Sequence, residues 1–130
     1  MQKNILSIDY GTKQIGLAYC NHEYIPLPIG NIDNNGDMWF TLMGNIAQHR
    51  SEIILIGYPK HEWMRLHIDK FIKTLQIMDN TLEIIRIDEN YTSVQAQAIT
   101  GEVGKHIAHD TLAAIEIINR YLNSVIPKWA

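Results

Sequence analysis

The sequence predicts an α/β fold in which a mixed five-stranded sheet, an antiparallel three-strand meander plus two parallel strands, carries helices on its faces. Two patterns support this prediction. The first apolar runs are separated only by turns, whereas the later runs alternate with segments of helical periodicity. With 130 residues, 46% of them hydrophobic and 19% charged, residues 1–130 are expected to form one compact domain with a substantial core.

The first two strands are predicted in residues 4–20, NILSIDYGTKQIGLAYC. Ile5 to Ile8 form one apolar run and Ile15 to Tyr19 form the other, and Gly11 gives the connecting turn its backbone freedom. Asp9 ends the first run, so its carboxylate is expected at the edge of the sheet. In a purely structural alternative, Asp9 accepts hydrogen bonds from the amides of the turn.

The third strand is expected at Tyr24 to Ile29, on an edge of the sheet, because Pro26 and Pro28 cannot donate to the middle of a ladder. A dense turn signal then ends in Asp37, the expected N-cap of a helix that runs to about Arg50. Met and Trp side chains on that helix could line a pocket, but an apolar stripe at this period is typical of core.

Two more strands alternate with helices in the rest of the chain. Glu52 to Tyr58 is a continuous apolar run, typical of a central strand in a parallel sheet, and a helix is predicted from Trp63 or Met64 to Met78. Leu82 to Ile87 is predicted to be a further buried strand. Thr92 to Ile99 follow as a short helix with a capping box, and residues 110–126 as a last helix that Pro127 ends.

Right-handed crossovers place the fourth strand beside the first and the fifth outside the fourth, so these three strands run parallel. Ligand sites in such open sheets gather at the carboxyl ends of the strands, near the point where the strand order reverses. Asp9 and Glu89 both lie at such ends, and the start of the last helix brings Asp110 near them. Asp88 alternates with Glu89 across the strand, so it faces the other way and is only a reserve ligand.

Carboxylates that come close together repel unless they are protonated or bridged by cations, and oxygen-only ligand sets suit Mg²⁺ or Mn²⁺ rather than Zn²⁺. Asp9, Glu89 and Asp110 therefore predict a hydrolytic metal site in which the ions activate water for attack on a phosphodiester. The alternatives are structural. Glu89 could simply solvate the end of its strand, and Asp110 could be an N-cap and nothing more.

Several other polar residues are candidates for supporting roles. His106 lies four residues before Asp110 and could act as a proton donor or an extra ligand. Lys13, Lys60 and Lys105 are placed where they could contact a phosphate backbone, although a solvated surface is the ordinary place for each. His109 adjoins Asp110, and the other four histidines, His22, His49, His61 and His67, lack the paired spacing of zinc ligands.

Composition bounds the class of protein. No apolar run approaches the ~20 residues of a membrane helix, and the N-terminus lacks a signal-peptide pattern, so a cytoplasmic protein is expected. The single cysteine, Cys20, suits a reducing compartment and is interpreted as a packing residue. The net charge of −3 gives no overall attraction for nucleic acid, but two bound divalent cations would reverse its sign.

Four segments together resemble the successive motifs of the YqgF family, RNase H-like proteins described as Holliday junction resolvases: ILSIDYGTKQIGLA, IILIGYPK, IDENYTSVQAQAI and HDTLAAIEIINRYL. The resemblance implies an RNase H-like fold and a Mg²⁺- or Mn²⁺-dependent endonuclease that processes pre-16S rRNA or resolves branched DNA, as a monomer or homodimer. Carried over by motif, the acidic residues of the family fall on Asp9, Glu89 and Asp110.

The chain departs from the family pattern at two places. Asn90 stands where the family usually has Arg, which removes a phosphate contact, and the loop at 57–62 is shorter than usual and differs in sequence. A non-catalytic RNase H-like nucleic-acid-binding module is therefore one alternative. Another is the nucleotide site of actin and the sugar kinases, which needs a second lobe that 130 residues cannot supply.

Overall fold

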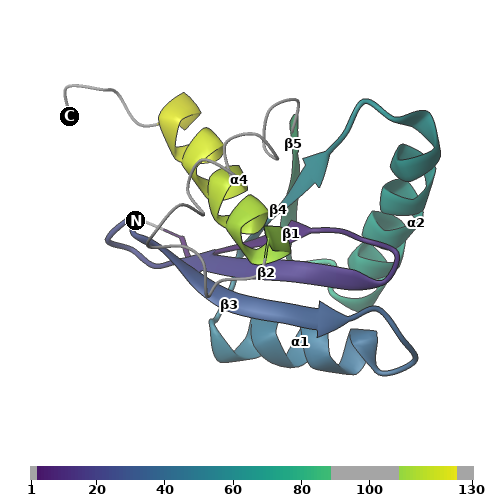
Figure 1. The fold of residues 1–130 in the computed structure, drawn as a ribbon. Helices are drawn as coiled ribbons and strands as arrows, with labels where there is room; N and C mark the ends of the chain where they lie inside the picture. Colours follow the sequence, from purple (N-terminus) through teal and green to yellow (C-terminus); the bar gives the residue numbers. More distant parts are fainter. Residues whose placement is uncertain (1–2, 89–108, 126–130) are drawn as a thin grey trace.

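The computed structural model describes residues 3–88 and 109–125 (Figure 1). The elements follow in the order β1 (Ile5–Asp9), β2 (Gln14–Cys20), β3 (Pro26–Asp33), α1 (Met38–Gln48), β4 (Ile53–Tyr58), α2 (Glu62–Met78), β5 (Glu83–Asp88) and α4 (His109–Val125). None of the described helices is long and apolar enough to span a membrane.

The five described strands form one mixed sheet in the order β3-β2-β1-β4-β5. The β1–β2 and β2–β3 pairs are antiparallel, whereas β4 pairs in parallel with both β1 and β5. This confirms the predicted meander and the predicted positions of the last two strands. The carboxyl ends of β1, β4 and β5 consequently lie at the same end of the sheet, together with the β1–β2 turn.

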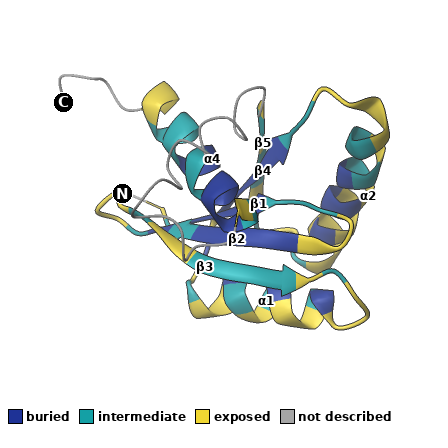
Figure 2. Ribbon diagram, in the orientation of Figure 1, coloured by how far each residue is buried: buried dark blue, intermediate teal, exposed yellow. Residues whose placement is uncertain are grey.

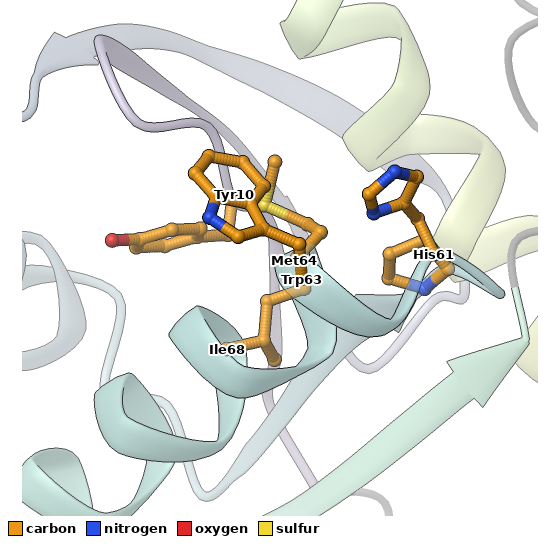
Figure 3. Close-up of a pocket in the computed structure, with 6 residues that line it drawn as sticks. Tyr10, His61, Trp63, Met64 and Ile68 are labelled. Carbon is orange, nitrogen blue, oxygen red and sulfur yellow. The ribbon is translucent and has the colours of Figure 1, made fainter.

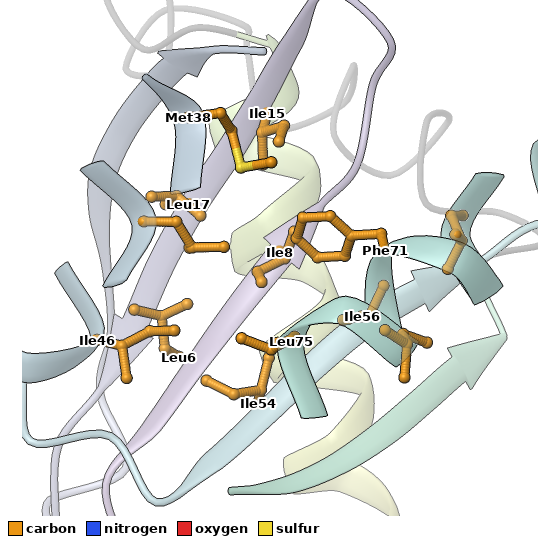
Figure 4. Packing of buried hydrophobic residues seen from close by; sticks show 13 residues of the cluster. Leu6, Ile8, Ile15, Leu17, Met38, Ile46, Ile54, Ile56, Phe71 and Leu75 are labelled. Atoms are coloured by element: carbon orange, nitrogen blue, oxygen red, sulfur yellow. The ribbon is translucent and has the colours of Figure 1, made fainter. Parts of the chain in front are cut away.

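Side-chain alternation along the strands divides the core into two layers (Figure 1). Leu6 and Ile8 of β1 point to the face covered by α1 and α2, where a large aliphatic cluster includes Phe71 (Figure 4). Ile5 points to the opposite face, which α4 covers. Figure 2 shows the result, with β1, β2 and β4 largely buried and the two outer strands less so.

The third strand begins and ends later than the predicted Tyr24 to Ile29. Tyr24 has a φ of 62° and its N–H donates to the Asn21 carbonyl, so it belongs to the preceding turn. Pairing with β2 continues to Asp33 because the ladder shifts register by one residue, and Gly30, with a φ of 130°, takes up the irregularity. The edge position is confirmed, since β3 pairs only with β2 among the described strands.

The prediction of a buried fifth strand was wrong. β5 lies on the other edge of the described sheet and none of its side chains is fully buried. The apolar side chains of β5 contact helices above and below the sheet. Within the described sheet, however, β5 has a neighbouring strand on one side only, so its side chains stay partly exposed. Asp37 does precede α1 as predicted, yet its side chain makes no capping hydrogen bond. The predicted helix at 92–99 falls outside the described residues.

Candidate active site

Asp9 ends β1 on the face of the sheet that α4 covers. Two residues earlier, the buried Ser7 hydroxyl donates to the Ala114 carbonyl of α4 over 2.6 Å. Because alternate residues of a strand share a face, Asp9 lies on the same side, half-buried at the carboxyl edge. The strand pattern thus directs this carboxylate toward the start of α4.

Gly16 brings Asp110 to the same place. Gly16 lies on β2, where it pairs with Asp9 of β1 on one side and with Asn31 of β3 on the other. These three residues therefore form a row across the sheet. A Cβ atom on Gly16 would overlap the Asp110 carbonyl, which means that the first turn of α4 lies directly on this row (Figure 1). Asp9 and Asp110 are therefore both neighbours of Gly16, although 101 positions separate them in the sequence.

Asn31 connects the other side of the row to α4. Its amide oxygen accepts a 2.6 Å hydrogen bond from the hydroxyl of the buried Thr111, and its amide nitrogen lies 3.5 Å from Asp110 Oδ2. The same nitrogen donates to Gln14 at 3.1 Å. These contacts orient the Asp110 carboxylate relative to the sheet. Asn31 was not predicted from the sequence, because it lies beyond the strand expected at Tyr24 to Ile29 and its partner is 80 positions away.

A cleft of about 600 Å³ opens beside Asp110, and its walls come from the β1–β2 turn, the end of β3 and the start of α2. The turn is held to β3 by Asn34, whose side chain donates to the Gly11 carbonyl over 2.8 Å. Gly11 is needed there, since a Cβ atom would overlap the Gln14 carbonyl. The residues lining the cleft are Gly11, Thr12, Lys13, Gln14, Asp33, Met64 and Asp110.

One of the three predicted basic residues, Lys13, lies at this cleft. Lys13 lines it together with Asp110, so an anion held near the carboxylates would meet an ammonium group. Lys60 is exposed in the segment after β4. Lys105 lies outside the described residues, as do Glu89 and His106.

A family model described as "RuvX: Holliday junction resolvase" matches residues 3–124. The chain belongs to this family. The match confirms the resemblance indicated by the four sequence motifs, and curated relatives of the RuvX-family chain point the same way. A Chlamydia caviae protein named "Putative pre-16S rRNA nuclease" is 32% identical over 98% of this chain and 87% of its own length. A Mycoplasma pneumoniae protein of the same name is 32% identical over 95% and 97%.

Two solved structures share the fold of this RuvX-family chain. T. thermophilus RuvC in complex with a Holliday junction substrate superposes with a TM-score of 0.66 at 12% identity, covering 98% of this chain and 99% of that one. The fowlpox virus resolvase with Holliday junction DNA gives a TM-score of 0.66 at 12% identity, covering 95% and 99%. These likenesses confirm the predicted RNase H-like fold.

Asp88 occupies the last position of β5, paired with Tyr58. It alternates with Ile87, which packs toward α4, and so falls on the face of Arg86, whose guanidinium contacts Asp69 of α2 at 3.2 Å. This is the face opposite to Asp9 and Asp110, as the alternation predicted. The Asp88 carbonyl nevertheless accepts a 2.7 Å hydrogen bond from Arg120, which ties the end of β5 to α4.

The residues present suit a hard divalent cation. Asp9 and Asp110 supply carboxylate oxygens on one face, the ligand type that Mg²⁺ and Mn²⁺ prefer. Within residues 3–88 and 109–125, no three His, Cys, Asp or Glu side chains gather as a metal site. The predicted third ligand, Glu89, is outside these ranges, so the three-carboxylate site stays a prediction.

Cys20 is not part of this site. It lies at the far end of β2, opposite Ile5, where it is 1% exposed and packs in the layer under α4. Burial raises the pKa of its thiol, which disfavours the nucleophilic thiolate. The interpretation of Cys20 as a packing residue is confirmed.

Proposed function

We propose that this RuvX-family chain is a metal-dependent nuclease that hydrolyses phosphodiester bonds at the cleft beside Asp110. The observation that carries the proposal is the placement of Asp9 and Asp110 around Gly16, at the carboxyl edge of the parallel strands. Two carboxylate residues from distant parts of the chain lie on one sheet face as neighbours of Gly16, and Asp110 lines a cleft there; carboxylate oxygens are the ligands that Mg²⁺ and Mn²⁺ take.

In this proposal Asp9, Glu89 and Asp110 hold the divalent cation or cations. When bound, such an ion lowers the pKa of a water molecule and stabilises the charge on the leaving oxygen, so that no nucleophilic side chain is required. The protein contributes positioning. Asn31 orients the Asp110 carboxylate, and Lys13 holds the phosphate backbone in the cleft by a direct charge contact.

The substrate class that we favour is an RNA precursor, in line with the names of the curated relatives. Branched DNA is the second candidate, in line with the family description. Either substrate carries the phosphodiester bonds that the proposed chemistry needs. The chain's cytoplasmic location and its state as a monomer or homodimer stay predictions.

The test is a cleavage assay with purified protein and labelled substrates: pre-16S rRNA, single-stranded RNA and a four-way DNA junction, each with and without Mn²⁺. We expect metal-dependent cleavage by the wild type and none by Asp9→Asn or Asp110→Asn, because each substitution removes an anionic ligand. Asp37→Asn is the matched control, since Asp37 precedes α1 and its side chain makes no capping hydrogen bond.

Two outcomes would contradict the proposal. Cleavage that persists at the wild-type rate in Asp9→Asn would identify a contaminating nuclease or a different site. Tight binding of every substrate without cleavage in any metal would favour the non-catalytic module, and Asn90 and the short loop at 57–62 would then be the residues to restore first.

A further inference from the structure

A second hollow, of about 330 Å³, adjoins the cleft and is built mainly from aromatic and apolar side chains (Figure 3). Its lining consists of Tyr10, Pro59, His61, Trp63, Met64 and Ile68. We infer that this aromatic pocket holds one unpaired nucleobase of the substrate strand, next to the phosphate that is cleaved. The inference rests on the proposed function, since it names how the same site grips its substrate.

The pocket shares one lining residue with the carboxylate site. Met64 lines both the aromatic pocket and the cleft that contains Asp110, whereas Tyr10, which follows Asp9, packs on the other face of the sheet against Phe71. A nucleotide whose phosphate sits beside these carboxylates therefore has its base within reach of the pocket. The volume is at the lower end of the roughly 300 to 1,000 Å³ typical of small-molecule sites, a size that suits one base rather than several.

Trp63 and His61 are both exposed rings of this pocket. Trp63 stands in the first turn of α2 with 52% of its surface exposed, near two imidazole rings. The His61 ring lies 6.3 Å away at 89°, and the His67 ring lies 4.5 Å away at 63°. Since the His61 and Trp63 planes are perpendicular, a base cannot be sandwiched between them. It would stack on one ring face and meet the other ring edge-on.

The Tyr10 side of the pocket is held by the core. The Tyr10 ring packs against Phe71 with centroids 4.9 Å apart, and Phe71 in turn stacks on Trp39 at 4.8 Å. Figure 3 shows Tyr10, Trp63 and Met64 grouped together, with His61 across from them. A wall that is already ordered reduces the entropy lost when a planar ligand binds.

Charge around the pocket favours a polyanionic strand over an apolar peptide. Residues 60–70 carry three cations, Lys60, Arg65 and Lys70, against two carboxylates, although the whole chain has a net charge of −3. One of those carboxylates, Asp69, is already paired with Arg86 at 3.2 Å. None of the three cations lines the pocket itself, and Arg65 donates to the Pro59 carbonyl over 2.6 Å, so they supply positive charge near the aromatic faces rather than a contact within it. Aromatic faces beside a positively charged groove are an arrangement by which proteins bind single-stranded nucleic acid.

The experiment measures binding of short single-stranded RNA and DNA oligonucleotides, each with one abasic nucleotide at a successive position, by fluorescence anisotropy without divalent cations. For the wild type, we expect one abasic position to weaken binding roughly 5- to 150-fold, the range of one base–aromatic stack. Trp63→Ala should weaken binding of the intact strand by a similar factor and remove the dependence on that position. Trp63→Phe should retain most of the binding affinity and of the dependence on that position.

Phe40→Ala is the matched control, because Phe40 is an aromatic residue of α1 with 86% of its surface exposed and no part in the pocket. The abasic series with wild-type protein needs no variant, so it decides the matter even if Trp63→Ala folds poorly. Equal binding of all abasic strands would overturn the inference, as would a Trp63→Ala variant with the wild-type abasic profile.

Cleavage of the same strands in Mn²⁺ separates this inference from the proposed function. Oligonucleotides that are cut, but whose binding is not weakened by an abasic nucleotide at any position, contradict the pocket alone. Oligonucleotides whose binding is weakened by an abasic nucleotide at one position, but which are never cut, contradict the nuclease and support the pocket. A wild-type protein that neither binds nor cuts any oligonucleotide in Mn²⁺ contradicts both.

Discussion

At the scale of single residues, the site depends on polar groups that hold one another in place. Asp110 does not stand alone at the start of α4, because Asn31 reaches it from β3 while also accepting a hydrogen bond from Thr111. Partners that orient a metal-ligating carboxylate contribute to metal affinity through geometry, without contacting the ion. Two predictions follow from these residues, one for a proposed ligand and one for its partner.

Asp9→Asn should abolish binding of Mn²⁺, measured by isothermal titration calorimetry, while the thermal unfolding midpoint stays close to that of the wild type. The amide keeps the size of the carboxylate but loses the negative charge that a hard cation requires. Asp37→Asn should bind the ion as the wild type does. Unchanged Mn²⁺ affinity in Asp9→Asn would remove Asp9 from the proposed ligand set.

Asn31→Ala should weaken Mn²⁺ binding about 10- to 100-fold, the usual cost of losing a partner that orients a ligand. Asn45→Ala is the control, because the Asn45 side chain donates to the Thr41 carbonyl of its own helix. If both variants bound Mn²⁺ equally well, Asn31 would have a purely structural role. Unfolding midpoints measured alongside would separate a local loss of orientation from general destabilisation.

At the scale of elements, the site exists because α4 lies unusually close to β2. The approach is possible since β2 presents Gly16 and Ala18 to this helix, whereas its alternate residues, Ile15 and Leu17, fill the opposite layer. The α4 layer uses small side chains at the contact, including the buried Ala114. Helix position and carboxylate position are thus set by the same close contact.

Gly16→Ala should destabilise the protein by about 1 to 3 kcal/mol, as expected for overpacking, because the added methyl group meets the backbone of Asp110. The midpoint of urea unfolding measures this. Gly44→Ala should instead stabilise by about 0.5 to 1 kcal/mol, since Gly44 lies within α1 and an added Cβ atom meets nothing within 4 Å. Equal midpoints for the two variants would show that α4 can move away from β2 at no cost.

At the scale of the whole molecule, the layers give an acidic protein a local site for a polyanion. The net charge of −3 repels nucleic acid, so in the proposed function we expect binding to come from the Lys13 cleft, the cations near the aromatic pocket and any bound metal ion. Contacts of this kind are electrostatic, and each neutralised phosphate makes affinity fall with added salt.

The logarithm of the affinity for single-stranded RNA should therefore fall linearly with the logarithm of salt concentration, and Lys13→Gln should reduce the slope by about 0.7. Anisotropy titrations over a range of KCl concentrations measure both slopes. Lys73→Gln is the control, because Lys73 is exposed on α2 and does not line the cleft. If the Lys13→Gln variant had the same slope as the wild type, the phosphate backbone of the RNA would not contact Lys13.

Three features could be predicted from the sequence alone: the order of the described elements, the edge position of β3 and the placement of Asp9 at a strand end. These follow from alternation, proline chemistry and apolar runs, which are properties of neighbouring residues. Three others depend on how the elements pack: the backbone of Asp110 lies against Gly16, Asn31 accepts a hydrogen bond from Thr111, 80 positions away, and β5 is half-exposed. The glycine in β2 was a signal of close backbone approach, but it could not name the approaching segment. Contacts between residues so far apart have no local pattern, because their partners meet only when the sheet and α4 pack together.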